Sequence, residues 1–330
     1  MEHVIFGNTG VRVSRACLGT MTFGLQCDEQ TSSAILDRAA EGGVNFIDTA
    51  DAYPLGGDVN TAGRTEEILG RWLKGRRHDY FLATKCSARM GTNPWDAGLS
   101  RKHVLDAIDG SLRRLDTDYV DLYQLHHPDP RTPMEETLGA LDDIVRAGKA
   151  RYTGISNHPA WQVARALGRS EVRKLARFAS VQPRYNLLFR EMEREMFPLC
   201  EEEGLAVIPY NPLAGGLLTG KHDPSAPPPA GTRFTTGSAA RNYQDRYWQD
   251  REFATVQELK AVADQAGLPL IRMAIAWVLA NPVITAPIIG ASRPEQLDDS
   301  LAAFEAALPP DLKKQLDDIT AEYRRGDAPR

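Results

Sequence analysis

The sequence predicts an α/β fold in which eight parallel strands, each followed by helical structure, close into a (β/α)8 TIM barrel. Short apolar, β-branched runs bounded by turn residues alternate with amphipathic helical patterns along the chain. There are eight such runs, and alternation of this kind produces parallel strands joined by right-handed crossovers. A single barrel domain can span all of residues 1–330.

The elements follow one another in a regular order. Strands are predicted, from first to last, at 16–18, 44–47, 80–83, 120–125, 151–155, 179–181, 206–208 and 286–289. Helices are predicted between them at 31–41, 65–73, 103–115, 135–147 and 193–203, and two more, at about 252–266 and 270–280, come before the last strand. Glycines at helix ends are the expected stop signals, and they stand at Gly42, Gly75, Gly148 and Gly204.

An open, doubly wound sheet is the alternative for a chain in which strands and helices alternate. Dinucleotide-binding folds of that kind usually carry a GxGxxG turn after a strand, and no such run follows any predicted strand here. The barrel is therefore the favoured architecture.

Segments outside the alternation have their own predictions. Runs at 4–6 and 11–13 around Asn8-Thr9-Gly10 predict an N-terminal β-hairpin that plugs the bottom of the barrel. The long stretch 223–249, after the seventh strand, is expected to be a lid over the pocket, which the loops 54–64 and 86–99 also shape. The residues from Arg324 onward are expected to fray.

Composition narrows the class of protein. Apolar residues make up 42% of the chain and charged residues 25%, the net charge is −5, and the positive residues are dispersed. This pattern argues against a nucleic-acid or anionic-membrane partner. The four cysteines match neither a metal-binding nor a disulfide spacing, and no signal peptide or membrane span of about 20 apolar residues is seen. We therefore expect a cytoplasmic protein without a metal.

Polar residues stand directly after several of the apolar runs. In a barrel the carboxyl ends of all strands meet at one face, where active sites are built. The residues that this rule selects are Asp48, Lys85, His126, Ser156, Asn157, Gln182 and Tyr210. Tyr53 follows Asp48 in the next loop and can bend back over the same face.

Four of these residues suit the reduction of a carbonyl group. Tyr53 can donate the proton, and a neighbouring Lys85 ammonium is expected to lower the pKa of the phenol from its ordinary value of about 10. Asp48 can hold Lys85 charged and aimed. His126 can orient the carbonyl oxygen, while His127 is expected to face the other way because side chains alternate along a strand.

The same positions lie in motifs that resemble the aldo-keto reductase family from one end of the chain to the other. The segments that carry the resemblance are LGTMTFG at 18–24, FIDTADAY at 46–53, ATK at 83–85, DLYQLHHPD at 121–129, GISNH at 154–158, SVQPRYN at 180–186, PYNPLAGGLLTGK at 209–221 and IIGASRPEQL at 288–297. The resemblance implies a catalytic tetrad of Asp48, Tyr53, Lys85 and His126. It implies nicotinamide contacts at Ser156, Asn157 and Gln182, with Tyr210 stacked on the ring.

The resemblance further implies NADP(H) bound in extended form, with phosphates near Leu213, Lys221 and Arg233. Local chemistry agrees, because Ser292 and Glu295 have the spacing of a capping box at a helix start, and Arg293 adds a charge suited to a 2′-phosphate. Gln296 is expected to lie one turn along. Ser300 stands where the long-lid branch of the family often has Asn, which leaves an adenine contact there open.

Taken singly, the selected residues have ordinary explanations. Asp48 could cap a turn, Tyr53 could be packing, Lys85 could be solvated, and His126 could be a satisfied core histidine. Their arrival at one barrel face favours the functional interpretation. Trp95, Tyr243 and Trp248 are the expected aromatic lining of the substrate pocket.

Two functions remain open. The first is an NADPH-dependent reductase of an aldehyde or ketone, and the second is a cofactor-binding regulatory or interaction subunit, because the long-lid branch includes potassium-channel β-subunits. The physiological carbonyl substrate and assembly into a homo-oligomer are not decided by the sequence.

Overall fold

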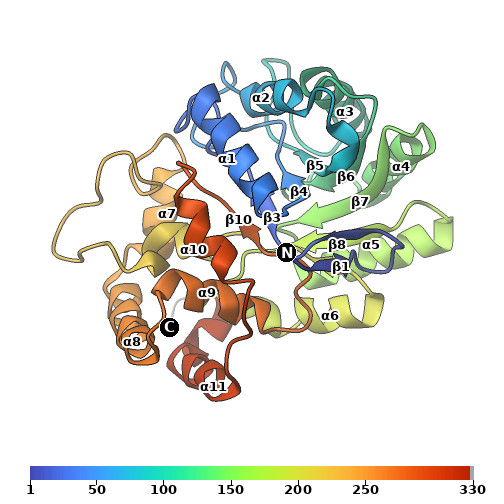
Figure 1. Ribbon diagram of the computed structural model, residues 1–330. Helices are drawn as coiled ribbons and strands as arrows, with labels where there is room; N and C mark the ends of the chain where they lie inside the picture. Colours follow the sequence, from blue (N-terminus) through green and yellow to red (C-terminus); the bar gives the residue numbers. More distant parts are fainter. Residues whose placement is uncertain (328–330) are drawn as a thin grey trace.

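The computed structural model describes residues 1–327, and its eight parallel strands confirm the predicted barrel (Figure 1). Each strand overlaps one of the predicted apolar runs. The strands are β3 Cys17–Gly19, β4 Phe46–Asp48, β5 Phe81–Cys86, β6 Val120–Leu125, β7 Ala150–Ser156, β8 Phe178–Gln182, β9 Ala206–Val207 and β10 Ile288–Ile289. They are arranged in the order β10-β3-β4-β5-β6-β7-β8-β9. The Ile288 N–H donates to the Pro209 carbonyl at 2.8 Å, which joins the last strand to the end of β9 and closes the ring.

Helices surround the strands, as Figure 1 shows. They are α1 Glu29–Glu41, α2 Arg64–Leu73, α3 Arg101–Leu115, α4 Met134–Arg146, α5 Ala160–Arg173, α6 Met196–Glu203, α7 Ala240–Tyr247, α8 Asp250–Ala266, α9 Leu270–Leu279, α10 Gln296–Ala302 and α11 Pro310–Ile319. Short 3-10 turns, η1 Arg77–Asp79, η2 Glu191–Glu193, η3 Ala214–Thr219 and η4 Ala321–Arg325, lie between them.

Two helices begin earlier than the apolar pattern predicts because polar residues cap them. The Asp28 carboxylate accepts a hydrogen bond from the Thr31 N–H at 2.8 Å, so α1 begins at Glu29. The Ser100 hydroxyl accepts from the His103 N–H, and α3 begins at Arg101. A side-chain acceptor at the cap satisfies one of the free N–H groups of the first turn and fixes the helix start.

The N-terminal hairpin plugs the end of the barrel away from the carboxyl ends of the strands. Strands β1 (His3–Ile5) and β2 (Arg12–Ser14) pair antiparallel, with Val4 opposite Val13. Phe6 is fully buried and its ring lies 5.8 Å from Phe46 and 5.0 Å from Phe81, centroid to centroid. These aromatic contacts fill the barrel interior, so this end is closed by packing.

The lid, residues 223–249, reaches across the mouth of the barrel. Its Ser238 N–H donates to the Gly56 carbonyl of the loop after β4 at 3.3 Å. The approach is so close that a Cβ built on Gly237 would lie 2.2 Å from that carbonyl oxygen. Part of the predicted loop is helical, since α7 occupies Ala240–Tyr247.

The chain after Arg324 does not fray over its described part, which corrects the expectation from sequence. Arg324 pairs with Glu193 at 3.1 Å, and Asp327 pairs with Arg184. These ion pairs hold the segment against the loop that follows β8. Residues 328–330 lie outside the described part of the chain.

Among residues 1–327, no single helix is long and apolar enough to cross a membrane. The bent pair α8 and α9 together reaches that length and composition, with 96° between the two helices.

Candidate active site

The carboxyl ends of the strands form one face around a cavity of about 1080 Å³. Asp48 ends β4, Lys85 is the penultimate residue of β5, and His126 follows β6. Asp48, Tyr53 and His126 line the cavity, whereas Lys85 lies behind its wall. The structure therefore brings together residues that are far apart in the sequence, as the rule of strand ends predicts.

Lys85 connects an acid and a phenol. Its ammonium group donates to Asp48 Oδ2 at 2.5 Å, to the Thr49 carbonyl at 2.8 Å and to the Tyr53 hydroxyl at 3.3 Å. The side chains of Lys85 and Asp48 are 0% and 3% exposed. Three acceptors use all three N–H donors of the ammonium, which is the condition for keeping a buried charge.

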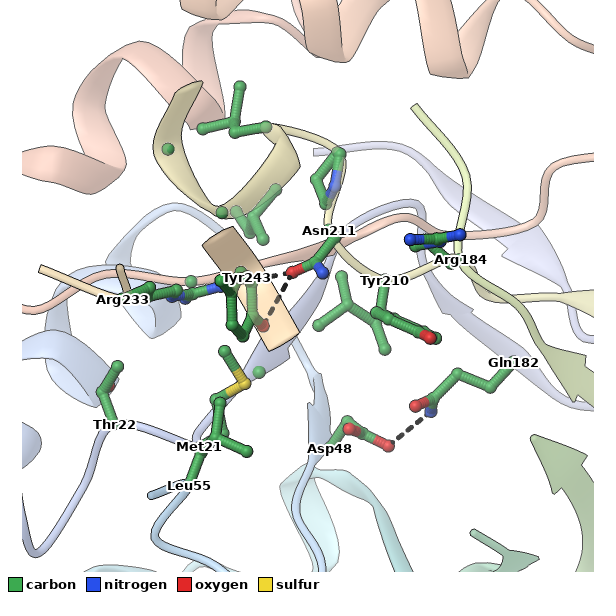
Figure 2. A pocket seen from close by; sticks show the side chains of 18 of the residues that line it. Met21, Thr22, Asp48, Leu55, Gln182, Arg184, Tyr210, Asn211, Arg233 and Tyr243 are labelled. Carbon is green, nitrogen blue, oxygen red and sulfur yellow. Dashed lines mark hydrogen bonds between the residues drawn. The ribbon is translucent and has the colours of Figure 1, made fainter. Parts of the chain in front are cut away.

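The second carboxylate oxygen of Asp48 is held by two amides. Gln124 donates to Asp48 Oδ1 at 3.0 Å. Gln182 donates to the same atom at 2.8 Å, and Figure 2 shows this second hydrogen bond. Gln124 was not selected from the sequence, because it lies inside β6 and the rule considers only residues after a strand. Its signal is a polar residue between Tyr123 and Leu125, near the end of the predicted strand.

Electrostatics set the protonation of this group. Burial alone lowers the pKa of Lys85, but Asp48 and Tyr53 outweigh it and raise the pKa to about 12. Burial raises the pKa of Tyr53 above its ordinary value, and Lys85 offsets this only in part. The net pKa of the phenol is thus raised, contrary to the expectation that Lys85 lowers it. In the absence of ligand, Tyr53 is a neutral phenol at pH 7.

His126 and His127 lie side by side, which corrects the expectation that they face opposite ways. Their rings stack with centroids 4.5 Å apart and 16° between planes, and both line the cavity. Strand β6 ends at Leu125, so the alternation of side chains does not extend to this pair. Burial, with Lys85 and His127, lowers the pKa of His126 well below its ordinary value. The His126 imidazole is therefore neutral.

The polar residues at or just after the ends of β7, β8 and β9 are linked to one another. The Tyr210 hydroxyl donates to Asn157 Oδ1 at 2.7 Å, and the Asn157 amide donates to the carbonyl of His126 at 2.8 Å. The Ser156 hydroxyl donates to the Gln182 carbonyl at 2.8 Å. Asn157 has a φ of 61°, a left-handed conformation that Asn tolerates better than most residues. The network fixes four of the predicted site residues on one side of the cavity.

The second arm of the cavity is the part lined by residues after β9 and β10. The residues predicted for cofactor phosphates and adenine all line it, namely Leu213, Lys221, Arg233, Ser292, Arg293, Gln296 and Ser300. Gly215 and Gly216 have φ values of 70° and 105°, and a Cβ on Gly216 would meet only the ring of His222, at 3.9 Å. Successive residues with such backbone geometry can turn N–H groups toward an anion. This arm suits an extended nucleotide with phosphate groups.

The predicted capping box at Ser292 and Glu295 is absent. Gln296 takes its place, because its Oε1 accepts from the Ser292 N–H at 2.9 Å and from the Ser292 hydroxyl at 3.2 Å. Helix α10 begins only at Gln296, and Glu295 makes no side-chain cap. A tight turn at 293–295 delays the helix, so Glu295 is out of register with Ser292.

The three aromatic residues expected in the substrate pocket differ in position. Tyr243 of α7 lines the cavity and donates to Asn211 Oδ1 at 3.3 Å (Figure 2). Trp95 does not line it: the side chain is 48% exposed, with the Lys102 ammonium 5.7 Å above its ring. Trp248 also lies outside the lining, because its ring packs against Phe234 at 4.8 Å under the lid.

Comparison with known proteins agrees with this geometry. Residues 15–321 match the model of the Aldo/keto reductase family. The chain is 40% identical over 327 residues to "Uncharacterized oxidoreductase YrpG" of Bacillus subtilis (strain 168), covering 97% of this chain and 96% of that one. It is 37% identical to "Probable voltage-gated potassium channel subunit beta" of Arabidopsis thaliana, covering 92% of each. It is 31% identical to "Versiconal hemiacetal acetate reductase" of Aspergillus parasiticus, covering 96% of each.

Proposed function

The chain belongs to the aldo/keto reductase family, and from this premise we propose that it is an NADPH-dependent oxidoreductase that reduces an aldehyde or ketone to an alcohol. The observation that carries the proposal is the contact of Lys85 with both Asp48 and Tyr53 at the cavity wall. A buried cation beside a phenol is the arrangement that proton donation to a carbonyl oxygen needs.

NADPH, when bound, supplies the hydride that reaches the carbonyl carbon. Tyr53 donates its phenolic proton to the carbonyl oxygen as negative charge develops there. The Lys85 ammonium stabilises the phenolate that is left, and the Asp48 carboxylate keeps Lys85 charged and aimed. His126, neutral, lies with its ring centroid 5.9 Å from that of Tyr53 and orients the carbonyl oxygen from the other side. The Tyr53 proton is restored from solvent after the alcohol leaves.

The cofactor has a set of residues suited to each of its parts. Ser156, Asn157 and Gln182 offer polar groups for a carboxamide, and Tyr210 offers its ring face for the nicotinamide. The second arm of the cavity suits the phosphates, with Lys221 and Arg233 near the middle of the cofactor and Arg293 for the 2′-phosphate. This last assignment is the basis for proposing NADPH over NADH.

We place the reaction in the cytoplasm, with a small carbonyl compound as the partner. All four cysteines are buried free thiols, as a reducing compartment would leave them. A homo-oligomer is compatible with this activity.

The test is a panel of aldehydes, ketones and keto-sugars mixed with the protein and either NADPH or NADH. We expect loss of nicotinamide absorbance with several panel members and faster loss with NADPH. Absence of turnover with every member would contradict the proposal.

The relative named as a potassium channel subunit supports a second candidate, a cofactor-binding regulatory subunit. It would bind NADPH tightly, turn over the panel negligibly and co-purify with a larger assembly. Rapid turnover by the isolated chain would exclude this alternative as the main role.

A further inference from the structure

Two arginines that the proposed chemistry does not use lie on the walls of the same cavity. Arg184 stands two residues beyond β8, and Arg246 lies in the last turn of α7. The chain as a whole is acidic, with a net charge of −5, so two guanidinium groups in one cavity are not explained by composition. They call for a local function.

Arg246 is turned toward the reacting residues. Ala239 before α7 lines the cavity together with Asn242, Tyr243 and Arg246 of the helix, and this spacing is that of one helix face. Arg246 acts electrostatically on two other residues of the cavity lining. It opposes the effect of burial on the pKa of Tyr210, and together with burial and Lys85 it lowers the pKa of His127. Arg246, Tyr210 and His127 all line the same cavity.

Arg246 has no anionic partner within the described part of the chain. No hydrogen bond or ion pair ties its guanidinium to any of residues 1–327. Its neighbour Arg241, on the opposite face of the same helix, pairs with Asp245 at 3.8 Å in solvent. The contrast between the two arginines shows that α7 holds an unpaired cation on its cavity face.

Arg184 is buried yet incompletely satisfied. The residue is 7% exposed, and its Nη1 is buried without a hydrogen-bond acceptor. The guanidinium stacks on the ring of Phe189 at 3.4 Å and pairs through Nη2 with Asp327, a residue of the C-terminal segment whose side chain is 58% exposed. The pair with Asp327 shows that the Arg184 guanidinium can bind a carboxylate. Glu191, also on the lining, is the other acidic residue at this end.

We propose that Arg246, assisted by Arg184, binds an anionic group of the substrate, so that the preferred substrates are carbonyl compounds that carry a carboxylate or a phosphate. The inference rests on the proposed function and names the substrate class of the same site. A charged hydrogen bond from a guanidinium to an oxyanion is directional and stronger than a neutral one. It would fix the distance between the anionic group and the carbonyl presented to Tyr53. Lid residues would then select the substrate as well as cover it.

The test compares matched substrates that differ in charge. We expect kcat/KM for 4-carboxybenzaldehyde to exceed that for methyl 4-formylbenzoate by about tenfold or more, the ratio that one charged hydrogen bond supplies. Arg246→Gln should lower this preference by about tenfold, mainly by raising KM for the carboxylate substrate. The value of kcat/KM for the ester should change less than about twofold. Arg246→Lys should restore part of it. Arg241→Gln on the outer face of α7 is the matched control and should change kcat/KM for neither substrate.

A second pair, glyceraldehyde 3-phosphate against glyceraldehyde, distinguishes a phosphate from a carboxylate as the preferred anion. Arg184→Gln tests the assisting residue with the same pairs, and its thermal unfolding curve checks the contact with Asp327. Equal kcat/KM values within both pairs for the wild type would overturn the inference. So would a preference that survives Arg246→Gln unchanged.

A binding measurement distinguishes a failure of this inference from a failure of the proposed function. Calorimetry with NADP⁺ present should show that 4-(hydroxymethyl)benzoate binds at least about tenfold more tightly than 4-methylbenzyl alcohol, and that Arg246→Gln removes the difference. Charge-selective binding without any turnover would contradict the reductase and support the anion site. Turnover without charge selectivity would contradict the anion site and support the reductase.

Discussion

The Lys85 ammonium lies 2.5 Å from Asp48 Oδ2 in an ion pair whose two side chains are almost completely shielded from solvent. Two amides hold the other carboxylate oxygen, and the Tyr53 hydroxyl is the third acceptor of the ammonium. The pair thus contributes to the stability of the fold and also holds a positive charge beside the Tyr53 hydroxyl.

Removal of one partner of this pair should destabilise the protein strongly. Lys85→Met leaves Asp48 buried without its cation, and we expect a loss of about 3–5 kcal/mol in the free energy of unfolding, measured by urea denaturation. The double variant Lys85→Met with Asp48→Leu should lose less than the sum of the single variants. Lys314→Met, which breaks an exposed pair with Asp318, is the matched control and should leave the midpoint unchanged. Equal effects of the two methionine variants would refute the account of the buried pair.

The rate of reduction should not depend on pH near neutrality. The pKa of His126 is well below its ordinary value of about 6.5 because of burial, Lys85 and His127. The pKa of His127 is lowered for related reasons, and that of His158 falls to about 4. Burial raises the pKa of Tyr53, so the proton donor stays protonated as pH rises.

We therefore expect kcat to be constant between about pH 6 and 8, the interval in which unperturbed histidine titrates. Initial rates at saturating cofactor and substrate check this, with His126→Asn as the comparison. An inflection near pH 6.5 in the wild type that His126→Asn removes would show that His126 titrates in the working enzyme.

The arginine after Ser292 should decide between the two nicotinamide cofactors. Arg293 is exposed and lines the cavity, and the proposed function assigns it to the 2′-phosphate of NADPH. Arg293→Ala should raise KM for NADPH by about tenfold or more and leave KM for NADH nearly unchanged, because NADH lacks that phosphate. Arg241→Ala, outside the cavity, is the control. An equal rise in KM for NADPH and for NADH would show that Arg293 does not bind the 2′-phosphate.

The N-terminal hairpin should matter for stability and not for chemistry. Phe6→Ala empties a fully buried aromatic site and should cost about 3–5 kcal/mol in the free energy of unfolding. Because the hairpin closes the far end of the barrel, kcat and KM of the folded variant should match the wild type. Ile5→Ala, at a residue that is 57% exposed, should cost less than about 0.5 kcal/mol. A large change in kcat for Phe6→Ala would contradict this prediction, because it would show that packing at the hairpin end affects the active site at the other end of the barrel.

The sequence predicts most of the fold because hydrophobic period and turn residues act locally. All eight strands overlap predicted runs, since most residues in each run are apolar or small enough to be buried in the barrel. Helix starts are predicted less accurately, because Asp28 and Ser100 cap α1 and α3, and these helices therefore begin two residues before the predicted ranges. The capping box at Ser292 failed for a related reason, since a turn changed the register of Glu295.

Some features of the site could likewise be predicted from local sequence, whereas others depend on contacts between distant parts of the chain. Strand ends identify Asp48, Lys85 and His126 because the fold alone places them on one face. The pKa of Tyr53 could not be predicted from its neighbours in sequence, because its burial exceeds the effect of Lys85. Arg246 reaches the cavity through the lid helix, a long-range placement that no local pattern encodes.

The central claim is that Tyr53 donates the proton, and Tyr53→Phe tests it most directly. The substitution removes one hydroxyl oxygen and keeps the ring that contacts His126. With NADPH and the best substrate of the panel, we expect kcat to fall by at least about 100-fold, the contribution of general acid catalysis, while the dissociation constant for NADPH stays the same. A variant that binds NADPH normally and retains the wild-type rate would contradict the account.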